Sequence, residues 1–285
     1  MIIAIASGKG GTGKTTVAIN LALSVDSTDS LFLDCDVEEP NAALFLHPTL
    51  EHREEVGVLI PQVDEDKCTA CGRCAEVCEF NAIAVVGQKV LVFPELCHGC
   101  GSCTLNCPEE AISEVLNVTG VLESGSAGDI RFWQGILDVG QAMAVPIIHQ
   151  LKERALDGFS PDGLAILDAS PGAACPVVEA VSGADFALMV TEPTPFGLHD
   201  LRIAVEVIRD ELHIPVGVVI NRDGVGDSGV DDYCAAEGVP ILMRIPLDRR
   251  IAEAYSEGVP MVRALPEYRQ KFIALYERIR QEVAK

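Results

Sequence analysis

A glycine-rich segment near the start of the chain restricts its possible folds more than any other feature. Residues 2–5 form a short apolar run, residues 8–15 read GKGGTGKT, and residues 17–22 then carry apolar side chains at helical spacing. This is the phosphate-binding pattern G-x-x-x-x-G-K-[ST] between a strand and a helix. Backbone N–H groups of such a loop turn onto phosphate oxygens, and the helix N-terminus adds partial positive charge. We therefore predict that the chain binds a nucleotide through this loop.

Two side chains of the loop have distinct predicted roles. Lys14 should reach the β- and γ-phosphates, and the Thr15 hydroxyl should hold Mg²⁺. A second Mg²⁺ ligand is predicted at Asp168, which ends the apolar run of residues 163–168, because a carboxylate at such a strand end holds Mg²⁺, usually through water. The alternative for Asp168 is a structural cap between a strand and a helix.

Further apolar runs predict the rest of a sheet. They cover residues 31–36, 163–168, 186–191, 216–221 and 240–245. Helical patterns lie between them, including residues 140–156, and a last helix at residues 268–283 should dock on the sheet. Strands that alternate with helices indicate an α/β fold with a mostly parallel sheet and helices on both faces. Ligands bind at the carboxyl ends of such strands, where Asp36, Asp168 and Asn221 are predicted to meet the glycine loop.

Eight of the eleven cysteines form two runs with the same spacing, C-x2-C-x2-C-x3-C. This is the pattern of bacterial ferredoxins with two [4Fe–4S] clusters, in which the fourth cysteine of each run ligates the other cluster. The first cluster is then predicted to bind Cys68, Cys71, Cys74 and Cys107, and the second to bind Cys97, Cys100, Cys103 and Cys78. Zinc is the alternative, because C-x2-C pairs also bind it, but two matching quartets in one short segment favour the clusters.

The cysteine segment divides the chain. Residues 61–113 are predicted to form an inserted α+β ferredoxin module, and residues 1–60 and 114–285 are predicted to be the two parts of a nucleotide-binding domain. After the insertion, a return strand is expected at residues 115–121 and a loop at residues 124–128. The nucleotide-binding domain is therefore expected to be discontinuous in sequence.

Charge and hydropathy limit the partners and the compartment. The formal net charge is −22 at pH 7, which argues against binding to nucleic acid or to anionic membrane, since both need basic surface. No apolar run approaches the ~20 residues of a membrane span, and Met1 leads directly into the first apolar run without a signal peptide. We expect a cytoplasmic protein without stable membrane insertion, in which the thiols are reduced and available as metal ligands.

The lysine after the first glycine of the loop narrows the family. With Lys9 the loop reads KGGTGKT, which resembles the deviant loop of the MinD/ParA-type ATPases, a group that includes the nitrogenase iron protein. The resemblance implies that the protein forms a homodimer when ATP is bound, and that Lys9 reaches the nucleotide of the partner subunit. It also implies that Asp36, the second aspartate of a D-x-D sequence, lies in switch I near the attacking water. An alternative role for Asp36 is a helix N-cap.

The resemblance has two further implications, for the base and for one isolated cysteine. Asn221 and Arg222 end a strand where relatives contact adenine, although an asparagine that satisfies a loop is the alternative. Cys175 follows Asp168 by seven residues, about the interval at which the nitrogenase iron protein ligates a cluster between its subunits. A structural role for Cys175 is nevertheless favoured over a ligand role, because no second cysteine of that kind is found nearby.

The motifs together predict an iron–sulfur protein that binds and hydrolyses ATP. The predicted nucleotide contacts are Gly8, Lys9, Gly10, Gly11, Thr12, Gly13, Lys14, Thr15, Thr16, Asn221 and Arg222. The predicted catalytic residues are Lys9, Lys14, Asp36 and Asp168, and the cofactors are ATP or ADP, Mg²⁺ and two [4Fe–4S] clusters. ATP-gated electron transfer to an unidentified partner protein is the first hypothesis. The alternative is an assembly or positioning factor, or a carrier of iron–sulfur or metal cofactors, in which ATP controls docking to a client.

Overall fold

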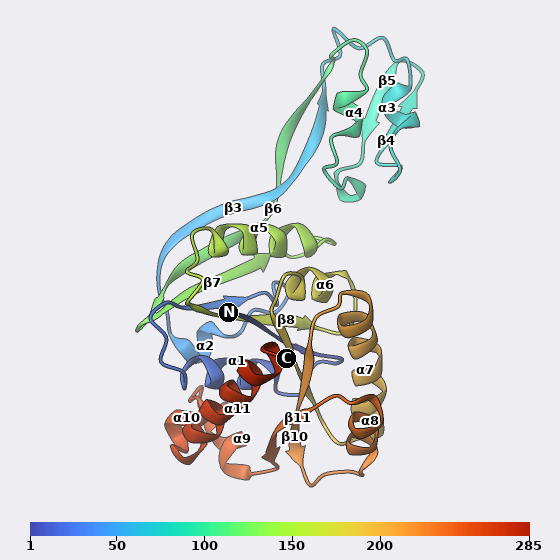
Figure 1. Cartoon of the computed structure of the whole chain (residues 1–285). Coiled ribbons are helices and arrows are strands. Elements are labelled where there is room, and N and C mark those ends of the chain that lie inside the picture. Colours follow the sequence, from blue (N-terminus) through green and yellow to red (C-terminus); the bar gives the residue numbers. More distant parts are fainter.

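A sheet of nine strands forms the centre of the computed structural model, which describes residues 1–285 (Figure 1). The strand order is β11-β10-β9-β1-β8-β2-β7-β6-β3. From β11 to β7 all neighbouring strands are parallel, whereas β6 runs antiparallel to β7 and to β3. The prediction of a mostly parallel sheet is therefore confirmed. The strands are β1 (Ile2–Ser7), β2 (Ser30–Asp34), β3 (Thr49–Val63), β6 (Ile112–Ala127), β7 (Ile130–Leu137), β8 (Leu164–Pro171), β9 (Phe186–Thr191), β10 (Val216–Asp223) and β11 (Ile241–Pro246).

Helices cover both faces of the sheet, as predicted (Figure 1). α5, α6, α7 and α8 pack into the core on one face, and α1, α2, α9, α10 and α11 pack into the core on the other. Successive side chains of a strand point to opposite faces, so Ala4 and Ala6 of β1 enter one core while Ile3 and Ile5 enter the other. The helices are α1 (Lys14–Ala22), α2 (Ala43–Leu46), α5 (Val145–Leu156), α6 (Cys175–Val181), α7 (Pro195–Val205), α8 (Gly229–Glu237), α9 (Arg249–Ser256), α10 (Met261–Ala264) and α11 (Glu267–Val283), and η2 (Glu206–Glu211) continues α7.

The carboxyl-terminal helix α11 docks on the sheet, as predicted. Its side chains Tyr268, Phe272, Leu275 and Ile279 are buried in the same core as α1. The buried residues recur at intervals of three or four, which places them on one face of the helix. No helix of the chain is both long and apolar enough to cross a bilayer.

A long two-stranded ribbon, β3 with β6, connects the body to a small module (Figure 1). The pairing runs from Thr49 opposite Ser126 to Val63 opposite Ile112. β6 pairs with β7 only from Gly120 onward, so the first part of β6 and the second part of β3 extend away from the sheet. The module is therefore attached to the edge of the sheet through continuous strands.

A β-bulge lies where the ribbon leaves the body. Gly120 is opposite Val56, and the register then shifts so that Thr119 is an extra residue on β6. Bulges bend a ribbon and increase its twist. The Gln150 side chain of α5 donates a hydrogen bond to the Gly57 carbonyl oxygen (2.9 Å), which fixes β3 to the body beside the bulge.

The module contains the two cysteine runs. Its elements are α3 (Arg73–Glu76), β4 (Ile83–Val86), β5 (Lys89–Val92), η1 (Pro94–Leu96) and α4 (Ser102–Leu105). β4 and β5 form an antiparallel pair, and Cys74, Ile83 and Cys103 form a small core. A backbone bond from the Asp64 N–H to the Ala111 carbonyl oxygen (2.8 Å) closes the base of this small α+β unit.

After the module, one expectation is wrong and one predicted helix is present but shorter than expected. The predicted loop at residues 124–128 is largely the end of strand β6. A Cβ on Gly125 would lie 1.9 Å from the Thr49 carbonyl oxygen, so this glycine serves the close approach of two strands and not a turn. The predicted helix at residues 140–156 begins only at Val145. The sequence patterns also do not predict β3 or β7.

Candidate functional site

The glycine loop lies between a strand and a helix, as predicted. β1 ends at Ser7 and α1 begins at Lys14. Gly11 and Gly13 have φ angles of 79° and 92°, a region that favours glycine. A Cβ on Gly13 would lie 2.3 Å from the side-chain nitrogen of Asn221, whereas a Cβ on Gly11 would meet no atom within 4 Å. The loop is thus packed on its Gly13 side and open at Gly11, which leaves space for phosphates against its backbone.

Lys14 is buried among carboxylates at the carboxyl ends of β2 and β8. Its side chain is 7% exposed, and Nζ lies 2.8 Å from Asp168 Oδ1 and 3.6 Å from Asp36 Oδ2. Burial lowers the pKa of Lys14, but the nearby charges of Asp168 and Asp36 outweigh burial, so the pKa is raised above its ordinary value. Lys14 is therefore held as a cation at the predicted position of the phosphates.

The other carboxylate oxygen of Asp168 fits a metal ion. Asp168 is fully buried, and its Oδ2 has no hydrogen-bond partner. A buried carboxylate oxygen without a partner is costly, and a hydrated Mg²⁺ held between Thr15 and Asp168 would satisfy it. The hydroxyl of Thr12 is also buried without a partner. The residues of this site therefore fit a nucleotide with its metal ion.

Asp34 is a site residue that the sequence analysis does not identify. Its Oδ2 accepts hydrogen bonds from the backbone N–H groups of Asn41 (3.0 Å) and Ala42 (2.9 Å). Its Oδ1 accepts one from the N–H of Asp36 (3.2 Å), so Asp34 shapes the loop that carries Asp36. Burial, followed by the charge of Asp168, raises the pKa of Asp34 to about 7, and burial also raises the pKa of Asp36. The D-x-D sequence is the signal that would have identified Asp34.

Lys9 is paired with Glu192, a second residue that the sequence analysis does not identify. Lys9 Nζ lies 3.0 Å from Glu192 Oε2, and Arg222 pairs with the other oxygen of the same carboxylate. Glu192 directly follows β9 and is 7% exposed. In the sequence, only its position at the end of an apolar run indicates that it could belong to the site. Because Lys9 is held by its own chain, its predicted action on a partner subunit requires it to leave Glu192.

Asn221 contacts the glycine loop through its side chain. Its Nδ2 donates a hydrogen bond to the Thr12 carbonyl oxygen (2.7 Å), and its Oδ1 accepts one from the Arg222 N–H (2.9 Å). These bonds join the end of β10 to the loop. They match the alternative of an asparagine that satisfies a loop, and the contact of Asn221 and Arg222 with adenine stays a prediction.

The eight cysteines of the module line two cavities, in the crossed sets that were predicted as ligands. The first thiol cavity is lined by Cys68, Cys71, Cys74 and Cys107. The second thiol cavity is lined by Cys78, Cys97, Cys100 and Cys103. Each cavity thus combines three cysteines of one run with the fourth cysteine of the other. The ligation of clusters by these sets stays a prediction.

The two runs also share a backbone geometry. Positive φ angles occur at the matched pairs Ala70 and Gly99, Gly72 and Gly101, and Asn81 and Glu110. The Ala82 N–H donates to Cys78 Sγ and the Ala111 N–H to Cys107 Sγ, both at 3.3 Å, and such bonds to sulfur tune iron–sulfur clusters. The two runs therefore hold their cysteines in equivalent backbone surroundings. No group of three or more His, Cys, Asp or Glu side chains has the spacing of a single-metal site.

Comparison with known proteins agrees with the geometry of the nucleotide site. The family model for the CobQ/CobB/MinD/ParA nucleotide binding domain matches residues 3–261. The chain belongs to this family. A similar protein of Methanocaldococcus jannaschii, itself uncharacterized, is 32% identical over 266 residues, which are 90% of each chain. The iron-sulfur cluster carrier protein of Pyrococcus abyssi is 25% identical over 278 residues, 91% of this chain and 78% of that protein.

The fold is also similar to that of a solved member of the MinD group. The septum site-determining protein MinD of Pyrococcus horikoshii, complexed with Mg-ADP, has a TM-score of 0.58. Its sequence is 22% identical, and the match covers 98% of this chain and 95% of that one. This likeness supports the α/β fold described above.

Three cysteines of this CobQ/CobB/MinD/ParA family member lie outside the two cavities. Cys35 and Cys234 are buried, and burial raises the pKa of both thiols, as expected of structural cysteines. Cys175 is exposed and is the first residue of α6, so it begins a helix as predicted. The structural role that was favoured for Cys175 stays a prediction.

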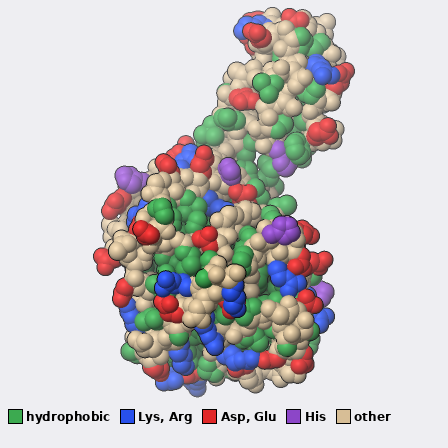
Figure 2. Space-filling model, viewed as in Figure 1, with side chains coloured by type: hydrophobic (Ala, Val, Ile, Leu, Met, Phe, Trp, Pro, Cys, Tyr) green, Lys and Arg blue, Asp and Glu red, His purple; other side chains and the backbone are tan.

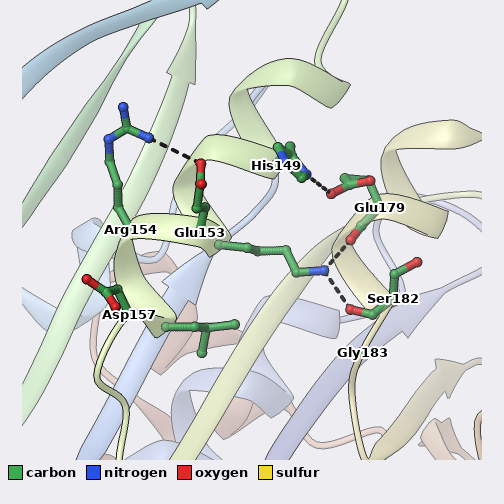
Figure 3. A pocket seen from close by; sticks show the side chains of 9 residues that line it. His149, Glu153, Arg154, Asp157, Glu179, Ser182 and Gly183 are labelled. Carbon is green, nitrogen blue, oxygen red and sulfur yellow. Dashed lines mark hydrogen bonds and ion pairs between the residues drawn. The ribbon is translucent and has the colours of Figure 1, made fainter.

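A groove between α5 and α6 is separate from the nucleotide site (Figure 3). Lys152 donates hydrogen bonds to the carbonyl oxygens of Glu179 and Ser182, and so caps the end of α6. His149 contacts the Glu179 carboxylate (2.9 Å). These contacts join α5 to α6 along the groove.

Proposed function

We propose that this protein binds and hydrolyses ATP with Mg²⁺, forms a dimer in the ATP state and holds two [4Fe–4S] clusters in its module. One combination carries the proposal: a buried Lys14 between Asp36 and Asp168, together with two cavities that each gather four thiols. The family match supports the nucleotide part. Anaerobic reconstitution is expected to give about eight iron and eight sulfide per chain, in a protein that releases phosphate from ATP.

Each residue at the sheet edge has one task in this proposal. Lys14 binds oxygens of the β- and γ-phosphates, and N–H groups of the glycine loop bind others. Thr15 and Asp168 hold Mg²⁺, which neutralises the charge of the phosphates when it is bound. Asp36 orients the attacking water, and Asp34 holds the loop of Asp36 in place through its backbone hydrogen bonds.

A short series of contacts leads from switch I to the base of the ribbon. The carbonyl oxygen of Val37, the residue after Asp36, accepts a hydrogen bond from the Leu137 N–H at the end of β7 (2.8 Å). The next N–H, of Asp138, donates to the Thr119 carbonyl oxygen at the bulge (2.9 Å). We infer that a movement of switch I on ATP binding is transmitted to the ribbon and reorients the module. ATP-gated electron transfer would then have a physical route.

Gating predicts that the affinity for ATP depends on the redox state of the clusters. Because binding linkage is reciprocal, any effect of ATP on the clusters requires an equal effect of their redox state on ATP binding. We expect roughly a fivefold difference, or about 1 kcal/mol, between oxidised and dithionite-reduced protein in anaerobic titrations. The control is a chain with serine in place of Cys71 and Cys100, which should show no effect of dithionite. Equal affinities in the loaded protein would contradict gating.

Delivery of clusters to client proteins is a second candidate function. The name of the Pyrococcus abyssi relative, iron-sulfur cluster carrier protein, favours it. So does the exposure of Cys71 and Cys100, one thiol of each cavity. Transfer of iron and sulfide to an apo-ferredoxin, accelerated by ATP, would support delivery. A chain that keeps its iron while it passes electrons to the same ferredoxin, already loaded with its own cluster, would support gated electron transfer.

Lys9→Ala should separate ATP binding from dimer formation. Lys9 is ion-paired with Glu192 and partly exposed, so the ATP affinity of the monomer should change by less than about fivefold. ATP-dependent dimers and phosphate release should be lost, because the partner's nucleotide would lack this lysine. Light scattering and a phosphate assay measure the two effects, with Lys271→Ala on α11 as the matched lysine control. Normal turnover of the Lys9 variant would rule out its action on the partner subunit.

A further inference from the structure

The two thiol cavities have equivalent thiols but different covers. The residue after the first cysteine of a run is Thr69 in the first thiol cavity and His98 in the second. The second residue after the fourth cysteine of a run is Glu109 in the first thiol cavity and Phe80 in the second. The two cysteine runs form an internal repeat, so the two thiol cavities can be compared position by position. Only the second thiol cavity has an aromatic cover.

The aromatic cover is continuous with apolar residues of the ribbon. The rings of Phe80 and His98 are stacked, with centroids 3.8 Å apart and planes at 15°. Leu59 of β3 lines the same cavity, and its cross-strand neighbour on β6 is Leu116, which points to the same side of the ribbon. Phe80 is 41% exposed, and each leucine is 49% exposed. These four residues are called the Phe80 patch below.

The charge near the Phe80 patch is negative. The only cations between Arg53 and Arg131 are Lys67, Arg73 and Lys89. Arg73 lines the first thiol cavity, and Lys67 pairs with an aspartate three residues earlier. Glu79 precedes Phe80, and Glu114 lines the second thiol cavity. Figure 2 likewise shows few Lys and Arg side chains on the ribbon and module, where hydrophobic side chains reach the surface.

Exposed apolar residues that form a patch beside a predicted cluster site indicate an interaction surface. Aromatic side chains are enriched at the centres of protein interfaces, and opposite charges around them select the partner and speed its approach. The Phe80 patch has an aromatic centre and acidic neighbours. The first thiol cavity has neither an aromatic cover nor a purely acidic lining, because Arg73 and Glu109 both line it.

We propose that the Phe80 patch is the docking surface for an electron-transfer protein that presents an apolar centre ringed by Lys and Arg. This inference rests on the iron–sulfur function proposed above. It assigns contact with the partner to the second thiol cavity alone, and it gives the stacked ring of Phe80 the central place in the interface.

Cytochrome c is a suitable probe, because it is basic and exposes an apolar haem edge. One electron passes from the reduced protein to the ferric haem, which becomes ferrous, and no proton moves and no bond forms. Redox-inert zinc-substituted cytochrome c measures affinity alone. Phe80→Gln should raise the Kd for zinc-substituted cytochrome c by at least about fivefold. It should slow the reduction of ferric cytochrome c by a similar factor. Glu109→Gln, at the equivalent position of the other cavity, is the matched control and should change both by less than about twofold.

A second variant tests whether the effect of Phe80→Gln comes from the docking surface or from damage to the cluster site. Leu116→Gln lies on the ribbon, outside both cysteine runs, and should raise the Kd by at least about twofold with unchanged iron content. Equal Kd values for the wild-type chain and both variants, all loaded with iron, would overturn the docking surface and leave the proposed function intact. A wild-type chain that takes up no iron would overturn both. Sedimentation that shows the patch joining two copies of the chain, without binding the probe, would overturn the assigned partner.

Discussion

Lys14→Ala is expected to weaken ATP binding by at least about 100-fold, which corresponds to about 2.7 kcal/mol. Lys14 is buried, and its ammonium group is the cation placed between Asp36 and Asp168. The variant loses charge-assisted hydrogen bonds to the phosphates. It also leaves two carboxylates facing the anionic nucleotide without a balancing cation, and like charges repel. Calorimetric titration with Mg-ATP measures the loss.

Two controls distinguish the loss of the Lys14–phosphate contact from the loss of the folded structure. Lys9→Ala removes another lysine of the same loop and should retain ATP binding by the monomer. Circular dichroism and thermal unfolding of Lys14→Ala show whether the body stays folded, because removing one partner of a buried ion pair is itself destabilising. Binding of ATP by a folded Lys14→Ala protein within about tenfold of wild type would contradict the assignment of the phosphate loop.

The parallel strands could be predicted because they are buried on both faces, so each is a continuous apolar run. Parallel topology then brings their carboxyl ends to one edge, and polar residues at those ends are predicted to meet there. The structure does bring Lys14 to Asp36 and Asp168, and Asn221 to the glycine loop. For this part of the site, local pattern and fold class contain the required information.

The ribbon could not be predicted in the same way. The first seven residues of β3 are exposed and include charged side chains, so no alternation of apolar residues marks the strand. Residues 124–126 of β6 read SGS, a composition typical of a loop. Both segments become strands because they pair with each other and because β6 pairs with β7. The pairing of β3 with β6 joins residues far apart in the chain, such as Thr49 and Ser126, and leaves no local pattern. The pairing of β6 with β7 is a local hairpin that closes at Ala127 and Ile130.

Asp34 and Glu192 show a second limit of the sequence. Each is an acidic residue at a strand end, which is a common position without a fixed role. Glu192 is a site residue because Lys9, 183 residues away, and Arg222, 30 residues away, both pair with it. Asp34 is a site residue because its carboxylate accepts a hydrogen bond from the backbone N–H of Asn41. These roles arise from tertiary contacts, which cannot be predicted from local patterns in a single sequence.

Cys107→Ser is expected to remove the first [4Fe–4S] cluster, although Cys107 belongs to the second cysteine run. In the fold it lines the first thiol cavity with Cys68, Cys71 and Cys74. Each cluster needs four thiolates, so the cavity that loses one should not retain its cluster. Iron and sulfide should fall from about eight to about four of each per chain after anaerobic reconstitution.

Alkylation identifies which cluster is lost. In Cys107→Ser, the thiols of Cys68 and Cys71 should become reactive toward iodoacetamide, while Cys97 and Cys100 stay protected by the second cluster. Cys78→Ser should give the reverse pattern, because Cys78 lines the second thiol cavity. Cys175→Ser, outside both cavities, is the control and should keep about eight iron. Alkylation of Cys97 and Cys100 in the Cys107 variant, with Cys68 and Cys71 protected, would show that each run binds its own cluster and that the crossed ligation is wrong.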